Sequence, residues 1–436
     1  MKPVNVGLLG LGTVGGGTVN VLQRNMQEIS RRAGAEIIVT HAATRDPKKP
    51  RICDTSGIEL SNNLRDVVDN PDIDIVVELI GGDTLALELV MRAINNGKHV
   101  VTANKALIAK FGNQIFSSAQ SKGVMVAFEA AVAGGIPIIK SLREGLSGNK
   151  INWLAGIING TGNYILSEMR DKGIPFEQVL ADAQRLGYAE ADPAFDVNGT
   201  DAAHKLTILA SIAFGIPLQF DKVAIEGITE ITGEDVANAE QLGYRIKHLG
   251  IARRTAKGIE LRVHLTFIPE RRLIANVDGV MNAVLVHGDA VGPTLYYGAG
   301  AGAEPTASAV VADIVDVART LTSDPENRVP HLAFQPDALA DLPILPLTEI
   351  ETAYYLRIQA EDKPGVLADI TQLLAEQGIS IEAIIQKEPP PGETSVTVIM
   401  LTHNVQEGKM DRAIKNIEDL TAINGSIMRI RVERLS

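Results

Sequence analysis

One stretch of the chain combines carboxylates and a lysine at a spacing that could move a proton. Between Ala183 and Lys205 the sequence places four carboxylates ahead of an apolar segment with helical periodicity. On that helix Asp201 and Lys205 lie one turn apart, in line with the apolar Ile208 and Ile212. An ammonium group on such a face loses hydration and needs a partner, so Lys205 is a candidate proton donor or acceptor, with Asp201 as its partner. A structural ion pair at the start of a helix would have the same spacing.

A glycine-rich turn near the start of the chain predicts a nucleotide site. The apolar run Val4 to Leu9 leads into this turn, and helical character follows it up to about Arg32. Glycines let backbone amides approach a pyrophosphate, which then lies at the positive end of the helix. The residues expected to hold a dinucleotide are Gly10, Leu11, Gly12, Thr13, Val14 and Gly15.

The residue after the second predicted strand bears on the choice of dinucleotide. This strand covers Glu36 to Ala43, and Arg45 follows it closely. An enzyme that uses NAD usually carries a carboxylate there for the ribose, whereas arginine favours the 2′-phosphate of NADP. The sequence therefore favours NADP. Asp46 and the lack of a second nearby arginine leave NAD open, and a solvated surface arginine would fit the same position.

A second lysine follows another strand of the predicted nucleotide sheet. The strand His99 to Thr102 is followed by Ala-Asn-Lys105, at the edge of the sheet where ligands bind in folds of this kind. Lys105 is therefore a candidate for contacting the nicotinamide or a substrate oxygen. The spacing alone suits a surface lysine equally well.

A glycine-rich segment after Glu129 could hold a small cation. One carboxylate together with the backbone carbonyls of Val132, Gly134 and Ile136 would supply the oxygen ligands that hard cations prefer. A tight turn with a solvated glutamate would have the same sequence.

Cysteine and histidine chemistry finds no support. The single cysteine, Cys53, has no histidine partner and no flanking glycines in the sequence, which is typical of an unreactive thiol. Oxidation of an aldehyde through a thioester needs a cysteine nucleophile, whereas interconversion of an alcohol and an aldehyde needs only a hydride and a proton. The eight histidines form no cluster with metal-ligand spacing, so zinc-assisted alcohol chemistry is unsupported. Lysine acid–base chemistry is the remaining candidate.

Length and charge bound the class of protein. A chain of 436 residues is long enough for two or three domains. The net charge of −12 argues against a nucleic-acid partner. No apolar run is long enough to span a bilayer, and the first residues enter an apolar strand without the pattern of a signal peptide. We therefore expect a cytoplasmic enzyme with no membrane partner.

The order of predicted elements indicates three domains. Residues 1–130 alternate strands and helices, which predicts a Rossmann-like, doubly wound α/β sheet. Residues 131–322 read as an α+β catalytic and oligomerisation domain, whose helix 306–320 would pack back on the nucleotide domain. A proline-rich linker over 323–350 leads to residues 351–434, whose βαββαβ pattern predicts a ferredoxin-like module.

The motifs together resemble the homoserine dehydrogenase family over about residues 1 to 330. The specific signature runs from Ala183 through Asp192-Pro193 and Asp201 to Lys205. Other motifs in the family's order are the glycine turn, Glu78–Gly82, Thr102–Lys105, Glu129–Ile136 and Asn159–Gly162. The tail, with Asp362-Lys-Pro-Gly-Val-Leu367 before a helix, resembles an ACT domain, which is a regulatory module that binds amino acids.

The resemblance implies reversible reduction of L-aspartate 4-semialdehyde to L-homoserine, with threonine and methionine downstream. It assigns the proton donor to Lys205, with Asp201 beside it and Lys105 near the cofactor. It assigns the substrate's amino group to Glu190. The secondary contacts to the substrate are Tyr188, Thr161 and Asp196. The residues on the cofactor side are Thr102 and Gly302. The resemblance also implies a sodium site formed by Glu129 with Val132, Gly134 and Ile136.

The ACT-like tail implies feedback regulation. We expect threonine to bind near Asp362 to Leu367, where backbone amides at a helix start can hold a carboxylate. Deletion of the residues after about 348 is expected to leave a working enzyme that threonine no longer inhibits. A homodimer or homotetramer is expected because the module offers strand edges. The alternatives are another NAD(P)-dependent amino-acid dehydrogenase and a catalytically silent amino-acid sensor.

Overall fold

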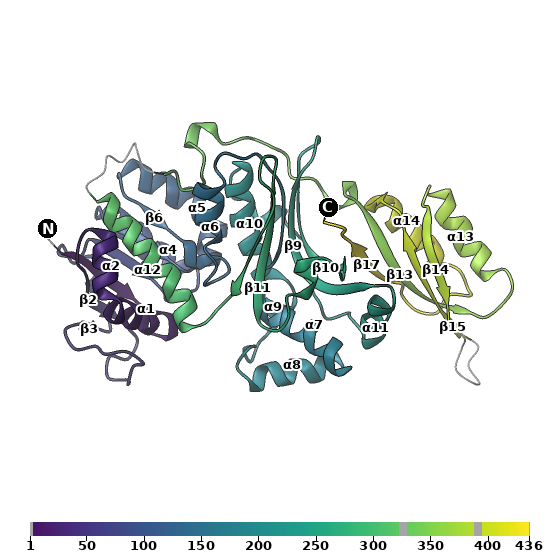
Figure 1. The fold of residues 1–436 in the computed structure, drawn as a ribbon, viewed down its shortest axis with the longest axis horizontal. Coiled ribbons are helices and arrows are strands. Elements are labelled where there is room, and N and C mark those ends of the chain that lie inside the picture. The colour runs from purple at the N-terminus through teal and green to yellow at the C-terminus, as the bar shows by residue number, and fades with distance from the viewer. Residues whose placement is uncertain (1–2, 322–328, 388–394, 436) are drawn as a thin grey trace. The chain divides into compact units, whose positions relative to one another are not determined.

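The computed structural model describes residues 3–321, 329–387 and 395–435. Their contacts divide the chain into two compact units. Figure 1 labels the helices and strands of the chain. The first unit comprises Met1–Gly160, Thr200–Val223 and Val280–Leu342, and the second comprises Thr161–Gly199, Ala224–Gly279 and Pro343–Ser436. Each unit therefore joins stretches that are far apart in the sequence. Within the described residues, every helix is too short or too polar to cross a membrane.

The first unit contains a six-stranded parallel sheet. The strands follow the order β3-β2-β1-β4-β5-β6. They are β1 (Val4–Leu9), β2 (Ile37–Ala43), β3 (Glu59–Ser61), β4 (Ile75–Glu78), β5 (His99–Thr102) and β6 (Val126–Ala127). The central strands are apolar and buried, as a sheet covered by helices requires. The predicted doubly wound parallel sheet is confirmed, and its strand order reverses between β1 and β4, where such sheets bind ligands.

Helices cover this sheet, including one from late in the chain. They are α1 (Thr13–Arg24), α2 (Met26–Ala33), α3 (Arg65–Val68), α4 (Thr84–Asn95), α5 (Lys105–Ser121) and α12 (Ala303–Thr320). Helix α12 packs on α1, and its Val310 and Ile314 share a core with Val19. A Cβ atom on Gly17 would lie 2.5 Å from the carbonyl oxygen of Ala303, so the close approach of the two helices requires a glycine here.

The rest of the first unit supports a buried helix. Strands β7 (Ile151–Ile157), β11 (Met281–Gly288) and β12 (Gly292–Ala299) pair antiparallel in the order β7-β11-β12. Short helical segments are η1 (Glu129–Ala131), α6 (Ile138–Lys140), η2 (Ser141–Gly145) and η3 (Phe220–Lys222). Helix α10 (Thr200–Phe214) packs against α5 and is buried at every position from Asp201 onward. Charged residues on such a helix must be partnered, which directs attention to Asp201 and Lys205.

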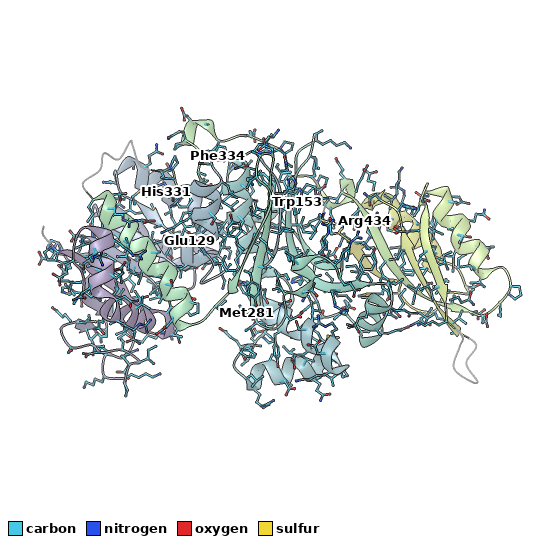
Figure 2. The ribbon with its side chains drawn as sticks, viewed as in Figure 1. Glu129, Trp153, Met281, His331, Phe334 and Arg434 are labelled. Carbon is cyan, nitrogen blue, oxygen red and sulfur yellow. The ribbon has the colours of Figure 1, made fainter. Side chains whose placement is uncertain are left out.

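The segment after α12 lies against α5. The ring of His331, which is labelled in Figure 2, stacks on Phe116 with ring centroids 4.9 Å apart. Its Nε2 accepts a hydrogen bond from the Val126 amide. A Cβ atom on Gly215 would lie 2.8 Å from the Phe334 ring. The predicted linker over 323–350 therefore makes contacts where it is described, while its first residues, 323–328, lie outside the described residues.

The second unit contains a long hairpin surrounded by helices. Strands β9 (Tyr244–Arg254) and β10 (Ile259–Pro269) pair antiparallel, and β8 (Ala224–Ile225) runs parallel to β10. The surrounding elements are α7 (Gly160–Lys172), α8 (Phe176–Arg185), α9 (Ala194–Val197), α11 (Gly233–Gln241) and η4 (Leu273–Asn276). Helix α11 starts with a capping box, in which Thr232 and Asp235 each bond the other's backbone amide.

The same unit ends in the predicted ferredoxin-like module. Its elements are β13 (Glu351–Glu361), α13 (Val366–Glu376), β14 (Ile381–Gln386), β15 (Ser395–Thr402), β16 (Val405–Gln406), α14 (Glu407–Glu418) and β17 (Met428–Val432). The sheet order is β17-β13-β15-β14, which confirms the βαββαβ pattern. The turn predicted at Pro389–Gly392 lies outside the described residues. Strand β17 also pairs with β10 at Arg431 and Val432, so the module's sheet continues into the hairpin.

Candidate active site

Asp201 lies between two lysine ammonium groups in the first unit. Lys205 Nζ is 2.7 Å from its Oδ2, and Lys105 Nζ is 2.9 Å from its Oδ1. Asp201 and Lys205 come from consecutive turns of α10, and Lys105 is the first residue of α5, just after the carboxyl end of β5. The structure therefore brings together the three residues that the sequence proposed for acid–base chemistry.

Burial and charge hold this cluster in a defined state. The Asp201 side chain is 3% exposed, whereas the side chains of Lys205 and Lys105 are 11% and 36% exposed. Burial alone would raise the pKa of Asp201, but the two ammonium groups lower it below the usual aspartate range. A carboxylate shared by two ammonium groups leaves net positive charge, which suits a substrate oxygen that gains negative charge.

Two groups at the end of β7 fix the orientation of the cluster. Asn159 Nδ2 donates to Asp201 Oδ2 at 2.8 Å, and Lys205 Nζ donates to the carbonyl oxygen of Ile158 at 2.6 Å. Asn159 is buried, with an exposed fraction of 6%. Because three donors meet the same carboxylate, the Lys205 side chain has little freedom to leave its position.

A second buried network positions Lys105. The Glu78 carboxylate at the end of β4 accepts a hydrogen bond from Thr102 Oγ1 at 2.6 Å. Asn104 caps α5, because its Oδ1 accepts from the Leu107 amide at 3.1 Å. Burial raises the pKa of Glu78, while its hydrogen bonds oppose the shift. These contacts join the carboxyl ends of β4 and β5 and hold the first turn of α5, including Lys105, in place.

The glycine turn has the geometry that a dinucleotide requires. Gly10 has φ +103°, and a Cβ atom there would lie 2.9 Å from the Leu79 carbonyl oxygen. A Cβ atom on Gly15 would lie 2.3 Å from the Gly10 carbonyl oxygen, so both positions exclude larger residues. Gly12 precedes the first helical residue, Thr13, and no side chain caps this helix. The free amides at the start of α1 can therefore bind a pyrophosphate.

Gly302 directly precedes α12, as Gly12 directly precedes α1. It has φ +129° and is the residue before α12, whose first residue, Ala303, approaches Gly17 of α1. The packing of α12 on α1 therefore brings Gly302 to the nucleotide half of this unit.

The loop after β2 contains a second arginine, Arg51, which contacts the two residues that flank Arg45. Arg45 is exposed. Arg51 folds back, and its guanidinium donates to the carbonyl oxygens of Leu11 and Asp46 and to Thr44 Oγ1. The expectation that no second arginine lies nearby is therefore wrong. Its cause is a loop closure that spacing along the sequence does not reveal.

The four residues proposed for the substrate pocket lie in the second unit. Thr161 Oγ1 donates to the carbonyl oxygen of Tyr188 at 2.7 Å, and the Tyr188 ring packs edge-on against Tyr164 with centroids 5.0 Å apart. Glu190 is exposed and Asp196 is partly buried. The structure therefore joins Thr161 and Tyr188 directly, whereas the lysine cluster belongs to the first unit.

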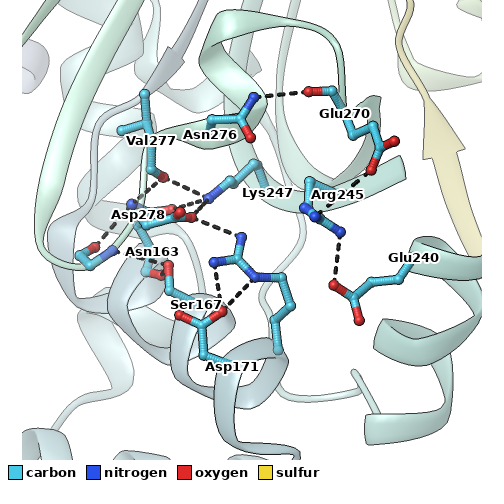
Figure 3. Close-up of polar contacts among 12 residues, drawn as sticks. Asn163, Ser167, Asp171, Glu240, Arg245, Lys247, Glu270, Asn276, Val277 and Asp278 are labelled. Carbon is cyan, nitrogen blue, oxygen red and sulfur yellow. Dashed lines mark hydrogen bonds and ion pairs between the residues drawn. The ribbon is translucent and has the colours of Figure 1, made fainter. Parts of the chain in front are cut away.

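A buried lysine supports the helix that carries Thr161. Lys247 on β9 is 1% exposed and donates to the carbonyl oxygen of Val277 at 2.6 Å and to Asp278 Oδ1 at 2.9 Å (Figure 3). Asn163, in the first turn of α7, donates to the same carbonyl oxygen. Burial lowers the pKa of Lys247, while Asp278 opposes the shift. The network ties α7 to β9.

The Glu129 carboxylate binds backbone amides in this structure. Its two oxygens accept hydrogen bonds from the amides of Ile139 and Lys140, both at 2.8 Å. Burial, with the nearby Asp313 carboxylate, raises the pKa of Glu129 to about 7. Among the described residues, no group of three or more His, Cys, Asp or Glu side chains could hold a metal ion. A cation at this segment would therefore depend on backbone carbonyls such as those of Val132 and Gly134.

A parallel sheet with a glycine turn, next to a buried lysine–aspartate cluster, is typical of an NAD(P)-dependent oxidoreductase. Residues 10–129 match the model of the homoserine dehydrogenase NAD-binding domain, residues 137–315 match that of homoserine dehydrogenase, and residues 354–422 match that of the ACT domain. The chain therefore belongs to the homoserine dehydrogenase family, whose members act on a CH–OH group, and it carries a C-terminal ACT domain.

Relatives match over the full length of the chain. Homoserine dehydrogenase of Pseudomonas aeruginosa is 67% identical over 436 residues, which are 100% of both chains. The crystal structure of a homoserine dehydrogenase from Thiobacillus denitrificans superposes with a TM-score of 0.95 at 67% identity, covering 100% of this chain and 99% of that one. A hyperthermophilic archaeal homoserine dehydrogenase in complex with NADPH has a TM-score of 0.62 at 25% identity, covering 72% of this chain and 98% of that one.

Proposed function

We propose that Lys205 performs the proton transfer of the homoserine dehydrogenase reaction in this chain. In this proposal bound NADPH supplies the hydride that reduces the aldehyde carbon of L-aspartate 4-semialdehyde. Lys205 gives a proton to the aldehyde oxygen and takes it back when homoserine is oxidised. Asp201 orients the Lys205 ammonium group, and Lys105 shares the acid–base role from the other carboxylate oxygen.

One observation carries this proposal. The buried Asp201 carboxylate binds both lysines, with Nζ–Oδ distances of 2.7 and 2.9 Å, in the same unit as the glycine turn. An ion pair that only stabilised the helix would need one lysine and no residue from the ligand-binding edge of the sheet. Two ammonium groups on one carboxylate provide a proton and a positive charge for the same oxygen.

The substrate's amino group is assigned to Glu190. This carboxylate is exposed, and within the described chain it has no ion-pair partner that would compete with a substrate ammonium group. Tyr188, Thr161 and Asp196 are proposed as secondary contacts. The hydrogen bond from Thr161 to the Tyr188 backbone supports this, because it holds the two side chains at one place.

NADP is proposed as the preferred dinucleotide, with NAD as a poorer one. Arg45 is exposed beside the end of β2, and Arg51 brings a second guanidinium to the same loop. Two arginines suit a 2′-phosphate, which is absent from NAD. The archaeal relative described with NADPH is consistent with this preference.

Replacement of Arg45 by alanine tests the preference. A charge-assisted hydrogen bond is worth about 1.5–3 kcal/mol, so KM for NADP is expected to rise about tenfold or more. KM for NAD should change little, because NAD offers no 2′-phosphate. Arg65→Ala provides the control, since Arg65 is an exposed arginine that pairs with Glu88. Equal changes for both dinucleotides would contradict the assignment.

Several further properties are part of the proposal. A sodium ion is assigned to Glu129, Val132, Gly134 and Ile136, with backbone carbonyls as ligands. Gly302 and Thr102 are assigned to the cofactor side of the site.

The cytoplasm is the proposed compartment. The proposed domains are residues 1–130, 131–322 and 351–434, with a linker over 323–350.

Threonine is the proposed effector of the ACT domain, at the turn between Asp362 and Leu367. Gly365 has φ +98° and precedes α13, whose first turn has no side-chain cap. Free amides at a helix start can hold the carboxylate of an amino acid. A homodimer or homotetramer is also proposed. Strand β12 supports it, because it is an edge strand that carries the exposed Tyr297.

Initial rates with L-homoserine test the proposal as a whole. Reduction of NADP should be faster with L-homoserine than with L-serine or other amino alcohols, and faster than reduction of NAD. Threonine should lower the rate and sodium should raise it. Equal rates with L-serine and L-homoserine would contradict the substrate assignment.

A further inference from the structure

The second unit contains a cavity of about 870 Å³ beside the ACT domain. One wall is the segment from Glu226 to Thr232, which follows β8. The opposite wall is formed by α14 and by residues 426–429 at the start of β17. This volume lies in the range of sites for small molecules. The turn from Asp362 to Leu367 is not part of its lining.

Both signs of charge line the cavity. Its carboxylates are Glu226, Glu230, Asp411 and Glu418, and its cations are Arg357, Lys415 and Arg429. A phosphate or other polyanion would meet the carboxylates and be repelled, and a polycation would meet the arginines. The mixture suits a ligand that itself carries one positive and one negative charge.

Most of these charges already have partners in the walls. Arg357 binds Asp235 with Nε–Oδ1 at 2.7 Å, and Glu226 binds Arg431 at 2.6 Å. Arg429 pairs with Asp411. These groups shape the cavity, but a ligand would have to break an existing ion pair to use them.

One cation and one anion remain available. Lys415 on α14 and Glu230 on the opposite wall are both exposed. In the described part of the chain, neither side chain forms an ion pair or a side-chain hydrogen bond. Glu418, one turn after Lys415, is engaged by the Ile427 amide at 2.8 Å. Lys415 and Glu230 can therefore bind a ligand without breaking an ion pair or a side-chain hydrogen bond in the cavity walls.

An open strand edge also faces this region. Strand β17 pairs with β13 from Met428 to Val432, but its other edge pairs with β10 only at Arg431 and Val432. The backbone from Met428 to Ile430 thus has one unpaired edge, and Met428 and Arg429 line the cavity. Unpaired backbone groups at a sheet edge can hydrogen-bond a polar ligand.

We infer that this cavity binds a free α-amino acid as a zwitterion, with its carboxylate on Lys415 and its ammonium group on Glu230. The site is separate from the proposed threonine turn and gives the ACT domain a second amino-acid site. The inference rests on the proposed regulation only in its choice of ligand class.

Binding to the full-length protein tests the inference. The probes are L-threonine, L-methionine and L-isoleucine, each titrated alone by calorimetry. The variants are Glu230→Gln and Lys415→Gln, and Lys409→Gln is the matched control, since Lys409 is an exposed lysine on α14 outside the cavity lining. Both cavity variants should raise Kd about tenfold or more for the probe that binds there, because each loses a charge-assisted contact. The control should leave Kd unchanged.

Three results would overturn the inference. One is that none of the probes binds, and another is that the cavity variants bind every probe with the Kd of the unaltered chain. The third is that the N-acetyl derivative of the bound amino acid, which lacks the ammonium group, binds as tightly as the amino acid itself. Homoserine oxidation is measured on the unaltered chain and on the same variants, which separates the two proposals. If the unaltered chain did not oxidise homoserine, the proposed function would be contradicted, while the binding result would still stand. A variant in the turn, Asp362→Asn, should leave the cavity's Kd unchanged.

Discussion

Replacement of Lys205 by alanine is expected to lower kcat for homoserine oxidation by about 10²- to 10⁴-fold, the usual contribution of a general acid or base. The proton then has to reach the substrate oxygen through water or through Lys105. Binding of NADP should be nearly unchanged, because the Lys205 ammonium group donates to Ile158 and Asp201, whereas the proposed pyrophosphate site is the glycine turn at the start of α1. Steady-state rates and a direct titration of NADP measure the two quantities separately.

The variant is expected to fold. Without Lys205, the Asp201 carboxylate keeps Lys105 at 2.9 Å and Asn159 at 2.8 Å, so no unpaired buried charge is created. Lys110→Ala is a suitable control, since Lys110 lies on α5 and pairs with the partly exposed Asp83. Unaltered turnover in Lys205→Ala would show that the lysine is only half of a structural ion pair.

The pH dependence of the cluster follows from the lowered pKa of Asp201. A carboxylate whose pKa is lower in the folded state than in the unfolded state stabilises the fold above its unfolded pKa of about 4. That contribution is lost as the pH falls below this value toward the folded pKa. Near neutral pH the carboxylate therefore remains charged, and loss of activity there must come from another group.

The proximity of Asp201, Lys205 and Lys105 could be predicted from the sequence because the patterns that indicate it are local. Asp201 and Lys205 are four residues apart on one helix, and Lys105 directly follows a strand of a recognisable parallel sheet. Helical spacing places Asp201 beside Lys205, and the ligand-binding edge of a parallel sheet accounts for the position of Lys105. The parallel sheet and the βαββαβ module were predicted for the same reason, since their elements follow one another along the chain.

Contacts between distant segments could not be predicted in this way. Asn159 begins the motif Asn159–Gly162, but nothing in the sequence around it indicates that it binds Asp201. Arg51 contacts Leu11 only because the loop after β2 closes on the glycine turn. Lys247 gave one signal, a lysine inside an otherwise apolar strand, yet its partner Asp278 lies beyond the next strand. Such pairings depend on how loops close, which spacing does not encode.

The structure argues against the expectation that the ACT domain can be deleted to leave a working enzyme. The proline-rich segment before residue 351 suggested a module that could be removed without harm. However, Tyr355, Ile430 and Val432 of the module share one core with Leu265 and Phe267 of β10. Of these, Tyr355 and Phe267 are fully buried. The sheet face that the module turns toward the hairpin is thus part of the second unit's core.

Buried charges also connect the module to the rest of this unit. Arg431 on β17 binds Glu226 at 2.6 Å and is 1% exposed. Glu433 binds Arg253 at 2.9 Å and also pairs with Arg262, which is completely buried. Removal of one partner from a buried ion pair typically costs about 3–5 kcal/mol, because the other charge stays buried and unpaired.

Truncation after residue 348 is therefore expected to destabilise the second unit severely. Each large core side chain that is lost costs about 2–5 kcal/mol, and the unpaired charges add to this, against a total stability of about 5–15 kcal/mol. The truncated chain should aggregate or unfold at a much lower temperature, and it should have little dehydrogenase activity. Soluble yield, thermal unfolding and initial rates with L-homoserine measure these effects.

Two matched variants of the full-length chain separate loss of regulation from loss of structure. Asp362→Asn changes only an exposed side chain at the proposed effector turn, so it should weaken inhibition by threonine while unfolding at the same temperature as the unaltered chain. Arg431→Met keeps an unbranched apolar stem but leaves the buried Glu407 without its main partner, so it should lower the unfolding temperature even without threonine. A truncated chain that purifies as a stable enzyme with full activity would show that the shared core is not required, and the simpler sequence-based picture of a removable module would then hold.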